Sequence, residues 1–205
     1  MRNKITCVII NALQLGYFYD WRADMPRKES ITKQYLIDTA FLMAKQEGIE
    51  NVTARKLASR AGCSTQPIFR LYENMEDLWK EIYDKSVEFF AFYNERSKNV
   101  AEEPFVNLGY AYIRFAAEET NLFKMLFLSD LNYGKSMYEV LNGKSGLVQA
   151  EMAKAKMAGV ANSGELFTKM WIFVHGAACM STTGDYDLGA DETVTLLKST
   201  YRSFM

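Results

Sequence analysis

The side chains best suited to a chemical task lie between positions 53 and 72, where cations and small polar groups occur together. This stretch holds the basic residues Arg55, Lys56, Arg60 and Arg70 and contains no aspartate or glutamate. In a chain with a formal net charge of -1, such a run predicts a local positive surface of the kind that attracts phosphates. The alternative interpretation of these cations is an ordinary solvated helix face.

Two short helices joined by a turn are expected to carry these side chains. Thr53 is a suitable N-cap for a helix over residues 54–61, which is expected to stop at Gly62. Ser64 is a suitable cap for a second helix over residues 65–72. A pair of this kind can place its second helix in the major groove of DNA while the first faces the backbone.

The start of the second helix offers three groups that suit the edges of bases. Thr65 supplies a hydroxyl, Gln66 an amide and Pro67 an apolar ring, and a proline is tolerated in a first turn. An amide can form two hydrogen bonds with adenine, and an apolar group can meet the methyl group of thymine. These residues therefore predict a surface that reads sequence.

The chain as a whole is predicted to be all-α, because apolar residues recur at helical spacing almost throughout and no stretch indicates a strand. One helix is expected over residues 30–47, before the short pair. A long helix is expected after it, from about 75 to 98, with Asn74 as its cap. Further helices are expected over residues 105–118, 121–127, 135–158, 164–181 and 192–204.

Three parts follow from this organisation. Residues 25–74 are expected to form a small three-helix head, and residues 75–205 a larger helical body. Residues 1–24 are interpreted as an extension of uncertain role, with an over-called start, an extra helix on the body and a secretory signal as the possibilities. The signal is the weakest of these, because no small-x-small cleavage site follows the apolar run at 5–19.

Composition excludes several other classes of protein. The three cysteines are far apart, which is typical of a reducing cytosol, and no apolar run reaches the roughly 20 residues that cross a bilayer. His175 is the only histidine, which excludes metal sites built from several histidines and disfavours a catalytic triad. We therefore expect a soluble cytoplasmic protein that is not an enzyme and has no catalytic residues, metal, cofactor or membrane partner.

The run VTARKLASRAGCS at residues 52–64 resembles the V-T-x-x-x-I-A-x-x-A-G-V-S signature of TetR-family regulators. The continuation at residues 68–78 resembles that family's L-Y-x-H-F-x-x-K-E-x-L. The resemblance implies an all-α homodimer whose two heads, each a helix-turn-helix domain, read an inverted repeat in double-stranded DNA. The DNA-binding residues predicted in this way are Thr53, Arg55, Lys56, Ser64, Thr65, Gln66, Pro67, Phe69, Arg70 and Tyr72.

Three positions depart from the family pattern. Phe69 replaces the usual tyrosine and lacks its hydroxyl, Leu71 stands where histidine is frequent, and Met75 replaces a usual lysine. The grip on the DNA backbone is therefore expected to be weaker or to depend on Arg70, Lys56 or the basic residues at 27–28. For Tyr72 the alternative interpretation is a core residue, because an aromatic ring there closes the head under either interpretation.

The body carries a second, looser match. Trp171, His175 and Gly176 resemble the W-x-x-x-H-G element of a TetR subgroup in which the late helices form a dimerising bundle. The aromatic and methionine content of the body fits either a core or a pocket for an apolar ligand. The ligand-binding residues that the resemblance suggests are Tyr110, Phe115, Phe123, Phe127, Met170, Trp171 and His175.

The predicted function is a ligand-responsive, DNA-binding transcriptional regulator. We expect a repressor that binds a palindromic operator as a homodimer and is released by a small, largely apolar effector. The alternative is a helical protein that binds small molecules or docks on a partner and has lost specific DNA binding, as Phe69 and Met75 would suggest.

Overall fold

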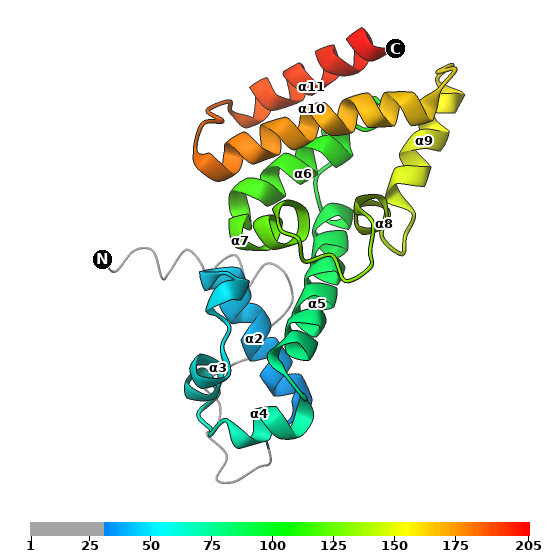
Figure 1. The fold of residues 1–205 in the computed structure, drawn as a ribbon. Helices are drawn as coiled ribbons and strands as arrows, with labels where there is room; N and C mark the ends of the chain where they lie inside the picture. The colour runs from blue at the N-terminus through cyan, green and yellow to red at the C-terminus, as the bar shows by residue number, and fades with distance from the viewer. Residues whose placement is uncertain (1–30) are drawn as a thin grey trace. The chain divides into compact units, whose positions relative to one another are not determined.

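A computed structural model describes residues 31–205, and within this range the chain forms helices joined by loops, with no strand (Figure 1). The all-α prediction is therefore confirmed. Residues Thr32–Met205 make up one compact unit. The extension predicted at 1–24 and the basic residues at 27–28 lie outside the described residues, and the boundary expected at position 75 stays a prediction.

The first elements surround the predicted pair of short helices. They are α2 (Lys33–Glu47), the 3-10 turn η1 (Ile49–Asn51), α3 (Ala54–Ala61) and α4 (Gln66–Leu71). The bounds of α3 agree with the prediction, whereas α4 is shorter by a residue at each end. Each of the three helices buries apolar side chains, among them Leu36 of α2, Leu57 of α3 and Ile68 of α4.

Helix α5 (Met75–Glu95) begins where the sequence predicts, because the side chain of Asn74 accepts a hydrogen bond from the backbone N–H of Asp77 at 2.9 Å. It ends three residues before the expected position. The indole N–H of Trp79 on α5 donates to the backbone carbonyl of Val52 at 3.0 Å. This bond fixes α5 to the segment just before α3. Helix α5 contacts both α2 and α6, so a single helix belongs to the packing of the head and of the body.

The body contains the remaining helices. They are α6 (Val106–Glu118), α7 (Thr120–Phe123), the π-helical turn η2 (Lys124–Leu128), α8 (Met137–Asn142), α9 (Leu147–Met157), α10 (Ser163–Thr183) and α11 (Ala190–Phe204). The single helix expected over 135–158 is wrong. Gly143 and Gly146 adopt positive φ angles of 57° and 71°, which end α8 and start α9.

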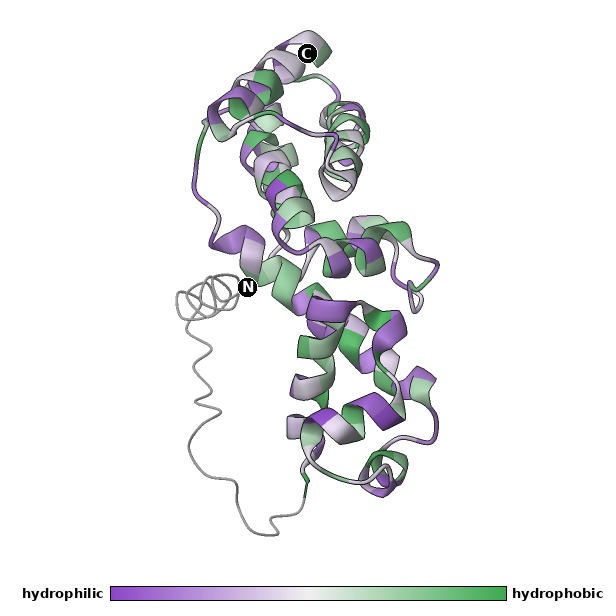
Figure 2. Cartoon of the chain, turned by 90° about the vertical axis from the view of Figure 1, so that its left-hand side faces the viewer, coloured by the Kyte–Doolittle hydropathy of each residue, from purple (hydrophilic) through white to green (hydrophobic). Residues whose placement is uncertain are grey.

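Helix α6 lies at the centre of the body, with α10 and α11 running side by side across it (Figure 1). Gly109 permits this close approach, because a Cβ atom built there would lie 2.9 Å from a methyl group of Val174 on α10. Each helix carries both hydrophobic and hydrophilic residues, as expected of amphipathic helices around a shared core (Figure 2). Among residues 31–205 no helix has the length and apolarity that crossing a membrane would need.

Five aromatic side chains fill the interior between α5, α6 and the α7–η2 segment. Their rings pack mainly edge to face, the arrangement that aromatic quadrupoles favour, with several centroid separations near 5 Å. We call this group the aromatic cluster; its members are Phe90, Tyr112, Phe115, Phe123 and Phe127.

Candidate functional site

The turn between α3 and α4 is held by backbone hydrogen bonds. Gly62 adopts a left-handed conformation with φ 68° and ψ 31°, as predicted for the residue that ends α3. The N–H of Cys63 donates to the carbonyl of Ala58 at 2.9 Å. Open space surrounds Gly62, so its φ angle, and not the lack of room for a Cβ atom, is the reason for a glycine there.

Hydroxyl groups stand at the start of both short helices. The prediction for Thr53 is confirmed, since its side-chain oxygen accepts from the backbone N–H of Lys56 at 3.3 Å. The prediction for Ser64 is wrong: the N-cap of α4 is Thr65, whose side chain makes no capping bond. Thr65 already has helical φ and ψ angles, which explains why it does not cap. Within residues 31–205 its hydroxyl has no hydrogen-bond partner.

The four cations of this region differ in what they contact. Arg60 forms an ion pair with Glu47 of α2 and donates to Gln46, while Lys56 donates to Asn51 at 2.7 Å. Glu47 lies 13 positions before Arg60, outside the stretch that sequence reasoning considered.

Arg55 and Arg70 are different, because both are exposed and neither has a partner within residues 31–205. The positive surface is therefore narrower than the sequence suggests. Among the described residues it centres on the guanidinium groups of Arg55 and Arg70, which have no ion-pair partner there and suit phosphate oxygens.

The outer face of α4 combines polar and aromatic groups. Gln66 and Arg70 are exposed, and the side chain of Phe69 between them is 54% exposed, whereas Ile68 points into the core. We call this group the α3–α4 surface; it consists of the exposed residues Arg55, Gln66, Phe69 and Arg70 and the half-buried Thr65. These side chains can donate hydrogen bonds, accept them and offer an apolar ring, as the reading of a nucleic acid requires.

Tyr72 lies in the core of the head, and its hydroxyl donates to Glu81 at 2.9 Å. Burial first, and then Glu81, raise the pKa of Tyr72 above its ordinary value. The predicted contact of Tyr72 with DNA stays a prediction. A direct contact by its hydroxyl would require the bond to Glu81 to break.

The body contains an apolar cavity of about 20 Å³ between α6, α8 and α10. Its lining residues are Phe105, Leu108, Gly109, Tyr112, Leu141, Phe167, Met170, Trp171 and Val174. Of the predicted ligand residues, only Met170 and Trp171 are among them. Phe115, Phe123 and Phe127 belong to the aromatic cluster. The guanidinium of Arg114 lies over the ring of Tyr110, 5.9 Å from the ring centroid.

Polar groups accompany this cavity. The hydroxyl of Tyr112 and Nδ1 of His175 are 2.9 Å apart, and burial lowers the pKa of His175. The Nε1 atom of Trp171 is buried and lies close enough to the hydroxyl of Tyr112 to influence its pKa. A buried indole N–H of this kind can donate to an acceptor on a bound molecule. Trp171 and His175 are four residues apart, about one helical turn, so both lie on the same side of α10.

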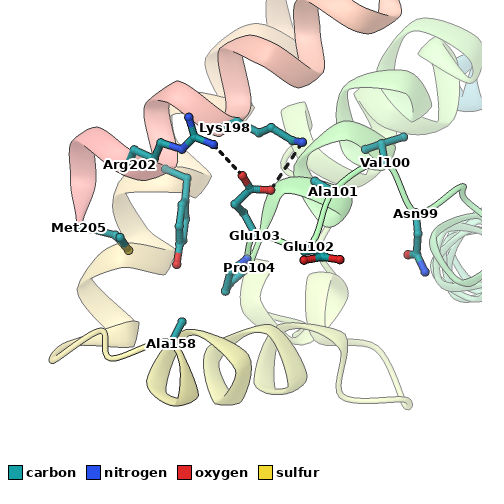
Figure 3. A pocket seen from close by; sticks show the side chains of 11 residues that line it. Asn99, Val100, Ala101, Glu102, Glu103, Pro104, Ala158, Lys198, Arg202 and Met205 are labelled. Carbon is teal, nitrogen blue, oxygen red and sulfur yellow. Dashed lines mark hydrogen bonds and ion pairs between the residues drawn. The ribbon is translucent and has the colours of Figure 1, made fainter.

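A second, open cavity of about 850 Å³ lies between the loop at 99–104, the end of α9 and the last turns of α11 (Figure 3). Glu103 occupies its wall and pairs with Arg202 at 3.1 Å and Lys198 at 3.7 Å. A backbone hydrogen bond, followed by these two cations, holds the pKa of Glu103 below its ordinary value. The two cations already have a carboxylate partner, and none of the predicted ligand residues lines this cavity.

Together, the all-helical fold and the turn that presents α4 with its polar outer face define a helix-turn-helix protein. Residues 36–82 match the family model described as bacterial regulatory proteins, tetR family. This segment is therefore similar to the DNA-binding helix-turn-helix of the TetR family of transcriptional regulators. No curated protein matches the chain significantly.

Solved structures share the fold over most of the chain. A TetR-like transcriptional regulator from a Rhodococcus species has a TM-score of 0.57 at 13% identity, over 86% of this chain and 97% of that one. A TetR-family regulator from Haemophilus influenzae has a TM-score of 0.58 at 15% identity, over 82% and 93%. Thermus thermophilus FadR, a TetR-family repressor in complex with lauroyl-CoA, has a TM-score of 0.50 at 16% identity, over 84% and 93%.

Proposed function

We propose that the protein is a cytoplasmic repressor that binds a palindromic DNA site as a homodimer and leaves that site when a small, largely apolar molecule enters its body. The observation that carries the DNA-binding part is that Arg55 and Arg70 are exposed, like Gln66, and have no partner within residues 31–205. Two unpaired guanidinium groups favour phosphates, and the amide can add base selection. Residues 25–74 are then the DNA-binding part and residues 75–205 the part for ligand and partner.

The exposed side of α10 supports the homodimer. Ile172 is 63% exposed and Met180 is 47% exposed, and Gly176 lies between them with open space where a Cβ atom would be. These positions are four residues apart and therefore form one stripe along the helix. A second copy of the same helix can cover the stripe by two-fold symmetry, with α11 at its side.

The interior of the body supports an apolar effector. The lining of the 20 Å³ cavity is almost wholly apolar, and a space of this size holds about one water molecule, so an effector must displace side chains to enter. FadR from Thermus thermophilus holds lauroyl-CoA in a related fold. A preference of about 1–3 kcal/mol for the form that cannot bind DNA would change DNA affinity roughly 5- to 150-fold.

The DNA-binding part is tested by selecting duplexes from a random pool with the purified protein and measuring their binding at two salt concentrations. Arg55→Ala combined with Arg70→Ala is expected to weaken binding by about 100-fold or more. It should also reduce the slope of log affinity on log salt by about 0.9 for each lost phosphate contact. Arg60→Ala is the matched control, since Arg60 is already paired with Glu47, and it is expected to have a much smaller effect.

The opposite result would be a protein that selects no sequence and binds random duplex equally well with or without the two arginines. That outcome would favour a helical docking protein over a regulator. The homodimer has its own test: Ile172→Glu should halve the mass in sedimentation and abolish binding to a two-half-site duplex. A wild-type protein that sediments as a monomer would contradict the proposed assembly.

A further inference from the structure

Among the phenylalanines of residues 31–205, Phe69 alone has an exposed side chain. A single exposed aromatic ring needs no explanation in itself. Its position is the relevant feature, because Phe69 follows Thr65 by four residues and Gln66 by three. Side chains at these separations are neighbours on a helix surface. The ring therefore belongs to the same face as the two groups proposed to meet base edges.

The chemistry of the major groove restricts what such a ring can contact. Each base edge presents hydrogen-bond donors or acceptors there, and the 5-methyl group of thymine is the principal apolar group. A phenyl ring placed over a donor or acceptor would remove it from water without giving it a partner, at a cost in free energy. A ring placed over a methyl group buries apolar surface on both sides.

We infer that Phe69 selects thymine, by packing its ring on the 5-methyl group of that base in each half-site of the DNA. This inference rests on the proposed function, since it requires α4 to enter the major groove. Phe69 would thus select a base, whereas the hydroxyl of a tyrosine at this position would bond a phosphate. Arg55 and Arg70 supply affinity in this arrangement, and Phe69 supplies part of the specificity.

Replacing thymine with deoxyuridine tests the inference, because this change removes only the methyl group. The probe is a fluorescein-labelled duplex obtained by selection from a random pool, with each thymine of the half-site replaced in turn. For wild-type protein, one position per half-site is expected to lose about 4-fold in affinity, or about 15-fold when both half-sites are changed. Phe69→Ala should bind the two duplexes equally, and Phe69→Leu should keep part of the discrimination.

Met157→Ala is the control, since this exposed apolar side chain lies on α9 of the body; it should leave the discrimination between the two duplexes unchanged. Equal binding of the thymine and deoxyuridine duplexes by wild-type protein would overturn the inference alone, with sequence-selective binding intact. Full discrimination in Phe69→Ala would overturn it as well. Failure to select any sequence would overturn the proposed function and this inference together.

Discussion

The α3–α4 surface and the aromatic cluster use large side chains in opposite ways. On the surface, Phe69 is exposed, and Arg55 and Arg70 have no partner within residues 31–205. In the cluster, Phe90 is fully buried and contacts the rings of Tyr112, Phe115 and Phe127. Side chains that a protein leaves free contribute little to its folding, whereas buried rings contribute much.

The comparison implies that stability and DNA affinity depend on separate residues. A substitution on the surface should change binding and leave the free energy of unfolding nearly constant. A substitution in the cluster should change the free energy of unfolding first. Phe90→Ala tests this separation directly, and two further variants with smaller expected effects test ionisable residues that belong to neither region.

Phe90→Ala should lower the free energy of unfolding by about 3–5 kcal/mol, since it removes a fully buried ring and leaves a cavity between α5 and its neighbours. Urea denaturation followed by circular dichroism measures this change. Phe69→Ala is the control and should stay within about 0.5 kcal/mol of wild type. Similar losses in both variants would contradict the separation.

The contact between α2 and the end of α6 depends on a single ion pair. Lys45 of α2 pairs with Glu119 at 2.6 Å, and the carboxylate side chain is only 12% exposed. Lys45→Met leaves that carboxylate unpaired and should cost about 1–3 kcal/mol at pH 7. Adding Glu119→Gln should restore part of the loss, which a double-mutant cycle measures.

The same pair makes a prediction about pH. Burial raises the pKa of Glu119 above its ordinary value, with Lys45 acting in the opposite direction. Loss of Lys45 removes the influence that favours the charged form. The penalty of Lys45→Met should therefore be largest at neutral pH and shrink as the pH falls through the raised pKa. A penalty that stays constant between pH 7 and pH 4 would indicate that lost packing, and not charge, is the cause.

The smallest effect is expected from His175. Burial lowers its pKa, so the unfolded chain takes up a proton at a higher pH than the folded chain. Stability should therefore decrease as the pH falls through about 6.5, the ordinary value for histidine. Thermal unfolding between pH 7.5 and 5.5 measures this slope. Because the chain has a single histidine, His175→Asn should flatten the slope, and an unchanged slope would contradict the assignment.

Local signals were enough to predict much of the fold. Thr53, Gly62 and Asn74 act where the sequence placed them because caps and left-handed turns depend on a few neighbouring residues. Ser64 misled the prediction, since serine and threonine are adjacent there and either could have been the cap. The helix expected over 135–158 failed because two closely spaced glycines each take a positive φ angle.

The parts that sequence could not supply depend on distant contacts. The pairing of Arg60 with Glu47 depends on how α2 packs against α3, so a count of charges between 53 and 72 overestimated the free positive surface. The aromatic residues of the body presented a similar problem. Composition alone cannot separate Phe115, in the aromatic cluster, from Trp171, which lines the cavity.

Helix α5 has the geometry of a lever, because it contacts both α2 and α6. Its 21 residues span roughly 30 Å at about 1.5 Å per residue. For a rigid rod of that length, a tilt of about 6° at one end displaces the other end by about 3 Å, close to the rise between adjacent base pairs. A small change in the packing around Phe90 would thus be magnified at the opposite end, beside the helix that carries Gln66.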